Sequence, residues 1–249
     1  MRRLWCASFA IGLVLGAIAP CRADDPAEPR ALIEKAIQAR GGAAKLNQFK
    51  AATWKGAGKF HGLGEAIDLT GEWAVQPPEQ SRSRVEFEFN GMKFQRLVVV
   101  NGDKGWVKLN DAVQDMDKEQ LAEEKSLAYA VRLTPLVTDK AYQLAPLGET
   151  KIGDRPAVGV KASHKDRRDV NLYFDKETGL LLKSETRVRD VLTGQEVGQE
   201  TFYSDYKEVG GLKHPMKIII RRDDRPFLEI QWSDFQPHDK LDDGVFAKP

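Results

Sequence analysis

The chain has 249 residues, of which 38 are Lys or Arg and 37 are Asp or Glu, so its formal charge at pH 7 is +1. This near-neutral balance argues against nucleic acid as a partner, because proteins that bind nucleic acid concentrate basic residues against its phosphates. The two cysteines, Cys6 and Cys21, both lie close to the N-terminus.

The N-terminus has the pattern of a secretory signal. Two arginines follow Met1, residues 4–19 carry no charge, and the small residue Ala23 precedes an acidic pair. We therefore expect residues 1–23 to be a signal peptide and the mature protein to lie in the periplasm. The uncharged run is shorter than the roughly 20 residues that span a bilayer. An alternative is lipidation at Cys21, which would anchor the protein to a membrane.

Cleavage after Ala23 leaves residues 24–249 without cysteine, so the mature chain has no disulfide and no thiolate nucleophile or metal ligand. It also lowers the number of basic residues from 38 to 35, against 37 acidic ones, which gives a formal charge of −2. No linker rich in Ser, Pro or Gly interrupts these residues. We therefore predict a single domain over residues 24–249.

Two helices are predicted. Pro29 suits the first turn of a helix and Gly41-Gly42 suits its end, so the first helix covers Pro29–Arg40. A second apolar stripe, with Asp117 as a good N-cap, predicts a helix over Asp117–Leu133 that Pro135 stops.

The rest of the sequence alternates apolar and polar residues between turns of the Asn-Gly type, which is typical of antiparallel strands with one face in water. We expect a mainly β fold, in which about ten strands form a curved antiparallel sheet. The two helices are expected to cover its concave face.

One face of the first strands is aromatic and apolar, and it is the candidate ligand-binding surface. Its residues are Trp54, Phe60, Ile67, Leu69, Trp73, Val85, Phe87 and Phe89. The opposite face carries Lys55, Asp68, Glu72, Arg84, Glu86 and Glu88. The apolar face has two interpretations, a core filled by the protein's own helices or an open cavity. Gly56, Gly58 and Gly71 share the apolar side, where they indicate either room for a ligand in a bent sheet, or a bulge or close approach of another group without a ligand.

Catalytic motifs are missing from the sequence. It contains no Gly-x-Ser-x-Gly elbow, phosphate-binding loop or His-Glu-x-x-His helix. The four histidines, His61, His164, His214 and His238, are far apart in the chain, and we expect each to be solvated in a loop. The acidic residues near the C-terminus lack the spacing of a calcium loop. We therefore expect no enzymatic activity, no metal and no cofactor.

Several stretches together resemble a known family. They are residues 36–46, 171–181, 203–215 and 241–246. Of these, the hairpin Tyr173-Phe174-Asp175 followed by Thr178-Gly179 is the clearest. In this pattern the chain is similar to the outer-membrane lipoprotein-sorting proteins, the LolA/LolB-like superfamily, over nearly the whole mature length.

The resemblance implies an unclosed β-barrel whose concave mouth is plugged by helices, and a non-enzymatic carrier that shields the acyl chains of lipoproteins or other lipids. We also expect a monomer, with at most a transient envelope protein as partner. The arginine that latches the lid in that superfamily has no clear counterpart, since Arg82 and Arg84 lie on the charged face and Arg96 precedes an unbroken apolar run. An alternative function on the same fold is a protein-interaction or stress-sensor module that transports no lipid.

Overall fold

The structure is a computed structural model that describes residues 27–129, 132–190 and 193–249. The predicted signal peptide, with its cleavage site and Cys21, lies outside the described residues. In the part of the chain that is described, no helix is both long and apolar enough to cross a membrane.

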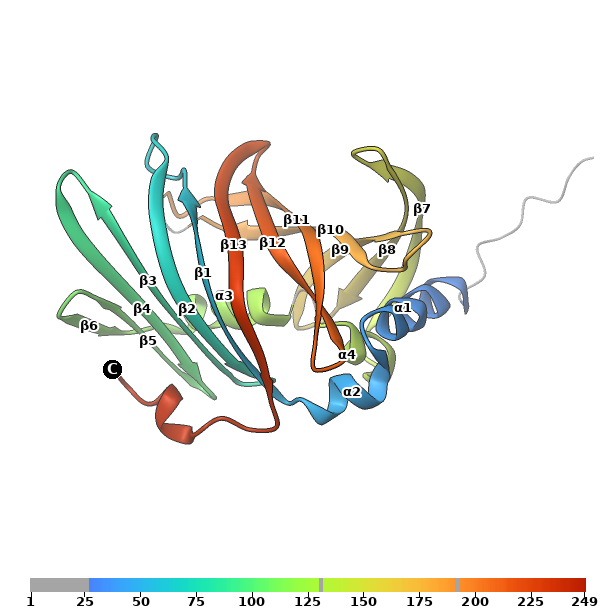
Figure 1. Cartoon of the computed structure of the whole chain (residues 1–249), viewed down its shortest axis with the longest axis horizontal. Helices are drawn as coiled ribbons and strands as arrows, with labels where there is room; N and C mark the ends of the chain where they lie inside the picture. The colour runs from blue at the N-terminus through green and yellow to red at the C-terminus, as the bar shows by residue number, and fades with distance from the viewer. Residues whose placement is uncertain (1–26, 130–131, 191–192) are drawn as a thin grey trace, which may run out of the picture.

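Thirteen strands in the described residues form one antiparallel sheet (Figure 1). The first six are β1 (Ala51–Phe60), β2 (Ile67–Gln76), β3 (Gln80–Phe89), β4 (Met92–Asn101), β5 (Lys104–Leu109) and β6 (Ala112–Asp115). The other seven are β7 (Gln143–Ile152), β8 (Arg155–His164), β9 (Arg167–Asp175), β10 (Leu181–Arg189), β11 (Glu196–Val209), β12 (Leu212–Arg222) and β13 (Arg225–His238).

The sheet consists of two meanders joined at the centre. Strands β1 to β6 follow one another to one edge, strands β13 to β7 follow one another to the other edge, and β1 pairs with β13 between them. The edges β6 and β7 do not pair, so the sheet is not closed. The predicted curved antiparallel sheet is confirmed, but the strand number is higher than ten. Strand β6 has only four residues, which is too short for alternation to reveal it.

The helices are α1 (Ala27–Ala39), α2 (Gly42–Gln48), α3 (Lys118–Tyr129) and α4 (Leu133–Thr138), followed near the C-terminus by the 3-10 turn η1 (Asp243–Phe246). The first predicted helix is confirmed as α1, and Gly41 at φ 121° separates it from α2. The second predicted helix is two helices instead of one. Pro135 does not stop it, because it lies in the first turn of α4, where a backbone N–H has no partner within the helix.

Helix α3 begins with a capping box. The Asp117 carboxylate accepts from the backbone N of Gln120 at 2.8 Å, and the Gln120 side chain accepts from the backbone N of Asp117 at 3.1 Å. The predicted N-cap is therefore confirmed, although the predicted C-terminal end at Leu133 is not.

Helices α1, α3 and α4 lie over one face of the sheet, which we call the inner face. Strand register carries this face across the whole sheet: Val98 lies opposite Ser83, Ser83 opposite Trp73, and Trp73 opposite Trp54. Over the second meander, α1 contributes Ile33 and Ile37 and α4 contributes Leu133 and Leu136, and these side chains pack on the inner face of β8 to β11. The residues of that face include Val160, Ala162, Val170, Leu172, Phe174 and Tyr203.

The opposite, outer face is covered only locally. Phe246 of η1 is fully buried against Leu97, Val99 and Trp106, on the outer side of β4 and β5. Val98 is buried on the inner side. The apolar run Leu97–Val100 therefore breaks the alternation because both faces of β4 are covered at this point.

Candidate functional site

A cavity of about 750 Å³ lies between the inner face of the sheet and the helices. Its apolar wall includes Leu46, Phe49, Ala52, Trp54, Val75, Pro77, Val100, Leu133, Phe235 and Pro237. Its polar wall includes Arg40, Asn47, Lys50, Glu79, Ser81, Lys125, Arg132, Thr134 and His214. We call it the inner cavity.

The pairing of neighbouring strands builds the floor of the inner cavity. Ala52 lies opposite Val75, Val75 opposite Ser81, and Ser81 opposite Val100, so side chains from four strands point to the same side. Leu133 and Thr134 of α4 face this floor from the other side of the cavity. Segments that are far apart in the sequence therefore enclose a single space.

Aromatic rings form the central wall. Trp232 makes edge contacts with Trp54 at 5.9 Å and with Trp73 at 4.5 Å between ring centroids. The His214 ring stacks on Phe235 at 3.9 Å with 7° between the planes. Such packing holds the rings in fixed positions, and Trp54, His214 and Phe235 are the members of this group that line the inner cavity.

The glycines of β1 and β2 do not provide room for a ligand. A Cβ at Gly56 would lie 2.7 Å from the Trp232 ring, and one at Gly71 would lie 2.5 Å from the Trp73 ring. A Cβ at Gly58 would meet the backbone of Glu229 at 1.8 Å. Of the two interpretations, close approach is therefore correct, and indole rings occupy the space beside two of the glycines.

Polar atoms in the aromatic wall are buried without partners. Among the described residues, neither Trp54 Nε1 nor His214 Nε2 has a hydrogen-bond partner. Burial, together with the nearby charge of Arg40, lowers the pKa of His214 to about 3, so the imidazole is neutral at pH 7. The expectation of solvated histidines is wrong for His214 and also for His164, whose side chain is 7% exposed.

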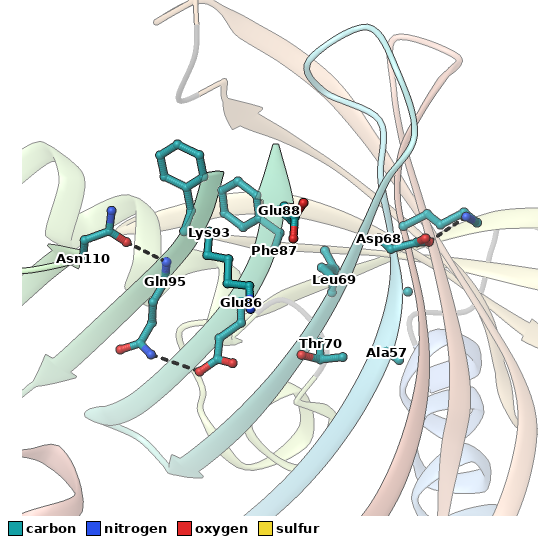
Figure 2. Close-up of a pocket in the computed structure, with 13 residues that line it drawn as sticks. Ala57, Asp68, Leu69, Thr70, Glu86, Phe87, Glu88, Lys93, Gln95 and Asn110 are labelled. Carbon is teal, nitrogen blue, oxygen red and sulfur yellow. Dashed lines mark hydrogen bonds and ion pairs between the residues drawn. The ribbon is translucent and has the colours of Figure 1, made fainter. Parts of the chain in front are cut away.

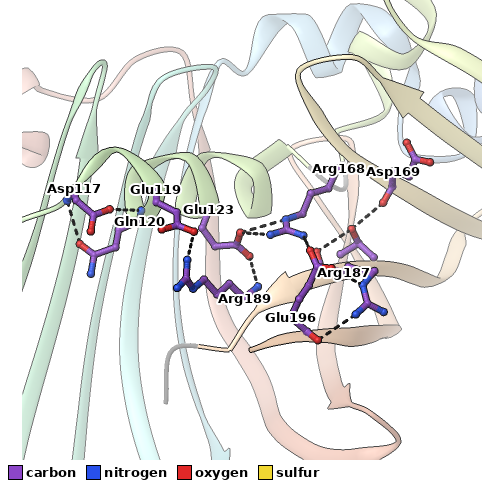
Figure 3. Close-up of polar contacts among 10 residues, drawn as sticks. Asp117, Glu119, Gln120, Glu123, Arg168, Asp169, Arg187, Arg189 and Glu196 are labelled. Atoms are coloured by element: carbon purple, nitrogen blue, oxygen red, sulfur yellow. Dashed lines mark hydrogen bonds and ion pairs between the residues drawn. The ribbon is translucent and has the colours of Figure 1, made fainter. Parts of the chain in front are cut away.

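Ion pairs fasten α3 across the sheet (Figure 3). Arg168 of β9 bonds Glu123 at 2.9 Å, and the other carboxylate oxygen of Glu123 accepts from the backbone N of Arg189 at 2.8 Å. Glu119 also pairs with Arg189, and Glu196 pairs with Arg168. At its other side, α3 packs Leu121 beside Gly105 of β5. The helix thus connects the two meanders.

A second hollow, of about 790 Å³, lies over β1 to β4 (Figure 2). Its charged lining residues alternate with Leu69 and Phe87 along the strands, so they belong to the outer face. Two of them, Lys59 and Asp68, pair at 2.7 Å, and Gln95 bonds Glu86 at 3.0 Å. These polar side chains therefore bond to one another on a surface that is exposed to solvent.

The structure does not bring all the predicted lining residues to one site. Trp54 lines the inner cavity and Trp73 packs beside Trp54. Leu69 and Phe87 share the inner face but lie farther along β2 and β3, where they border the second hollow and not the inner cavity. Phe60 packs edge-on against Phe227, and Phe87 stacks on Phe94. Of the other predicted residues, Ile67 is buried, and Val85 and Phe89 are half-buried.

Sequence reasoning missed Phe235, His214, Leu133 and Arg40 as cavity residues. Phe235 has an inward position in the last strand, but only the β1–β13 pairing places that strand beside Trp54. No sequence signal gives that pairing. Among the described residues, no group of three or more His, Cys, Asp or Glu side chains is placed to hold a metal.

Together these features define a class: an open antiparallel β-barrel whose inner face is covered by helices and contains a largely apolar cavity. No family model matches the sequence, and no curated protein matches it. The fold, however, is similar to that of solved structures.

One similar structure is a LolA superfamily protein from Nitrosomonas europaea, with a TM-score of 0.58, 16% identity, and coverage of 88% of this chain and 97% of that chain. A second is a domain described as an outer membrane lipoprotein-sorting protein, from Vibrio parahaemolyticus. Its TM-score is 0.59 and its identity 12%, and the match covers 90% of this chain and 98% of that chain. A third is a DUF1329 family protein from Desulfovibrio piger, with a TM-score of 0.58, 15% identity, and coverage of 90% of this chain and 98% of that chain. The predicted LolA/LolB-like resemblance is thus confirmed at the level of the fold.

Proposed function

We propose that this protein is a non-enzymatic carrier of the cell envelope that binds the acyl chain of a lipoprotein or another lipid in the inner cavity. The observation that supports this most directly is the cavity itself, of about 750 Å³, between the helices and an aromatic wall. We further propose that the protein is exported to the periplasm, acts as a monomer, and contacts an envelope partner only transiently.

The size and chemistry of the inner cavity suit an acyl chain. Small-molecule sites are typically clefts of roughly 300–1,000 Å³ with mostly apolar walls. Each methylene that leaves water contributes about 0.8 kcal/mol, so a long chain binds without directional contacts. The rings of Trp54 and Phe235 offer flat apolar surface, and Val75, Val100 and Leu133 complete it.

The alternative of a protein-interaction module finds less support in the edges of the sheet. A partner strand would have to add to β6 or β7. Strand β6 has four residues, and β7 carries Pro146 next to a register shift at Gly148. Short strands, prolines and bulges are features that prevent strand addition. We therefore favour the carrier.

Filling the inner cavity tests this proposal. Ser81 is half-buried on its floor between Val75 and Val100, and the substitution Ser81→Trp would place an indole in the space. We expect the affinity for a fluorescent fatty acid to fall at least about tenfold, the equivalent of about 1.4 kcal/mol. The matched control is Ser204→Trp on an exposed position of β11, which should leave the affinity unchanged.

Thr134→Trp places an indole in the same cavity from α4. It therefore shows whether an effect of Ser81→Trp comes from filling the cavity or from a local change in β3. Thermal melting of each variant shows whether it is folded. If both variants remain folded and bind the probe as the parent does, the inner cavity is not the binding site. If the parent binds no lipid probe, the carrier proposal fails.

A further inference from the structure

The inner cavity has an excess of positive charge in its wall. Arg40, Lys50, Lys125 and Arg132 line it, whereas Glu79 is its one acidic lining residue in the part of the chain that is described. The charge of Lys125 is neutralised locally, because its Nζ lies 2.9 Å from Glu79 and 3.4 Å from Asp103. An acyl chain alone needs none of these charges.

Arg40 is the basic residue whose environment is hardest to explain by the fold alone. It follows α1, is half-buried, and donates from Nε to the backbone oxygen of Lys213 at 3.0 Å. Among the described residues, no carboxylate lies within ion-pair distance of its guanidinium. A guanidinium has five N–H donors, and a buried cation is unfavourable unless an anion or several acceptors compensate it. Burial accordingly lowers the pKa of Arg40.

Two further polar atoms belong to the same wall. Trp54 Nε1 can only donate a hydrogen bond, and His214 Nε2 donates in one neutral tautomer. Both atoms are buried and lack partners among the described residues. Arg40 and His214 both line the inner cavity, and the positive charge of Arg40 adds to the burial that lowers the pKa of His214. The wall therefore presents a cation and N–H donors to the inner cavity, and Glu79 is the single carboxylate among its described lining residues.

We propose that the ligand of the inner cavity is an amphiphile with an anionic headgroup, a carboxylate or a phosphate, and that Arg40, Trp54 and His214 receive that headgroup. This inference rests on the proposed carrier function and adds a ligand class to it. An anion would accept hydrogen bonds from the guanidinium and the indole, and charge-assisted bonds of this kind are the stronger ones. The acyl chain would then lie along Val75, Val100 and Leu133.

Headgroups on chains of equal length provide the test. Purified mature protein is first titrated with uncharged N-phenyl-1-naphthylamine, whose fluorescence reports entry into an apolar cavity. Dodecanoate, dodecyl phosphate, dodecan-1-ol and dodecyltrimethylammonium then compete with it, each below its micelle concentration. We expect the two anions to bind about tenfold more tightly than the alcohol and the cation to bind most weakly. Comparing the affinities of dodecanoate and dodecyl phosphate shows whether the site prefers a carboxylate or a phosphate.

Variants identify the residues. Arg40→Gln should remove most of the tenfold preference for the anions, measured as the ratio of their affinities to that of dodecan-1-ol for the same variant. Trp54→Phe keeps an aromatic ring without the N–H and should reduce the preference several-fold. Arg40→Lys keeps the charge and should retain part of it. The matched control is Arg221→Gln, since Arg221 is exposed and points to the outer face.

The outcomes separate the two proposals. If neither the naphthylamine nor any chain binds, the carrier function is wrong. If all chains bind with equal affinity, or the anionic preference survives Arg40→Gln in a folded variant, the carrier function stands and the headgroup inference is overturned. Melting curves establish folding, and Trp54→Phe supplies an independent result if Arg40→Gln does not fold.

Discussion

The two meanders of the sheet carry the same alternating pattern but differ in what covers their inner face. In β9, Leu172 and Phe174 are almost completely buried under α1 and α4. In β3, by contrast, no residue is fully buried, and Phe87 and Phe89 are half-exposed on the inner side. Alternation therefore indicates which face is apolar, but the path of the helices decides whether that face becomes core or cavity.

The position of the helices follows from the topology. The chain leaves the first meander at β6 and enters the second at β7, at opposite edges of the sheet, so α3 and α4 must cross the inner face. Helix α1 joins α4 over the second meander only. Over the first meander, α3 is the helix that crosses the inner face. The inner cavity lies beside α4, where the helices cease to cover the sheet.

The largest expected effect tests the difference between the filled half and the open half of the inner face. Phe174→Ala removes a ring from the filled half, and we expect the free energy of unfolding to fall by about 3–5 kcal/mol. Phe87→Ala removes the same ring from the open half, where it is half-buried and stacks on Phe94, and should cost about 1–2 kcal/mol. Urea unfolding measures both. Equal losses would show that the two halves are equally filled.

Much of this difference was not predictable from the sequence. The alternation correctly placed Trp54 and Trp73 on one face with Leu69 and Phe87, and it placed Lys55 and Glu72 on the other. These predictions succeed because a period of two is a local property of a strand.

What failed depends on contacts between distant segments. The inner cavity needs Phe235 and His214 beside Trp54, and therefore the pairing of the first strand with the last. The arginines that hold α3, Arg168 and Arg189, come from hairpins more than 40 residues away from the helix. No local pattern encodes such pairings, so the sequence predicted an apolar face of the sheet without the distant strand and helix that complete the cavity.

The second prediction concerns His214, which is half-buried in β12 and lines the inner cavity where the covered and open halves meet. Its pKa in the folded protein, about 3, is below the usual value of 6.5, so the unfolded chain binds a proton that the folded protein does not. Stability should therefore fall as the pH drops below about 6.5, and between about pH 7 and pH 5 the loss from this group should be about 1–2 kcal/mol.

The test of this loss is His214→Phe, which keeps a ring on Phe235 and has no proton to bind. Its free energy of unfolding should change less between these pH values than that of the parent. The matched control is His61→Phe, at the residue that follows β1, which leaves His214 in place and should retain the dependence of the parent. Parallel pH profiles for parent and His214→Phe would contradict the prediction.

The third prediction concerns the bridge between the halves. Glu123→Gln removes the charge that holds Arg168 and the backbone N of Arg189, so α3 should loosen from the second meander. We expect a loss of about 1 kcal/mol, together with faster hydrogen exchange in α3 and unchanged exchange in β8 and β9. Glu149→Gln breaks an exposed pair with Lys176 and should have no measurable effect. Unchanged exchange in α3 would show that these ion pairs do not fasten it.

The smallest effect is expected on the outer face of the open half. Lys59 pairs with Asp68 at 2.7 Å, but both side chains are more than half exposed, so water and salt screen the pair. Lys59→Ala should change the free energy of unfolding by less than about 0.5 kcal/mol. It should also leave lipid binding unchanged, because the hollow that Lys59 lines lies on the opposite side of the sheet from the inner cavity. A loss of lipid binding in the folded Lys59→Ala variant would instead move the site to the outer hollow, and the difference between a filled and an open inner face would then have no bearing on function.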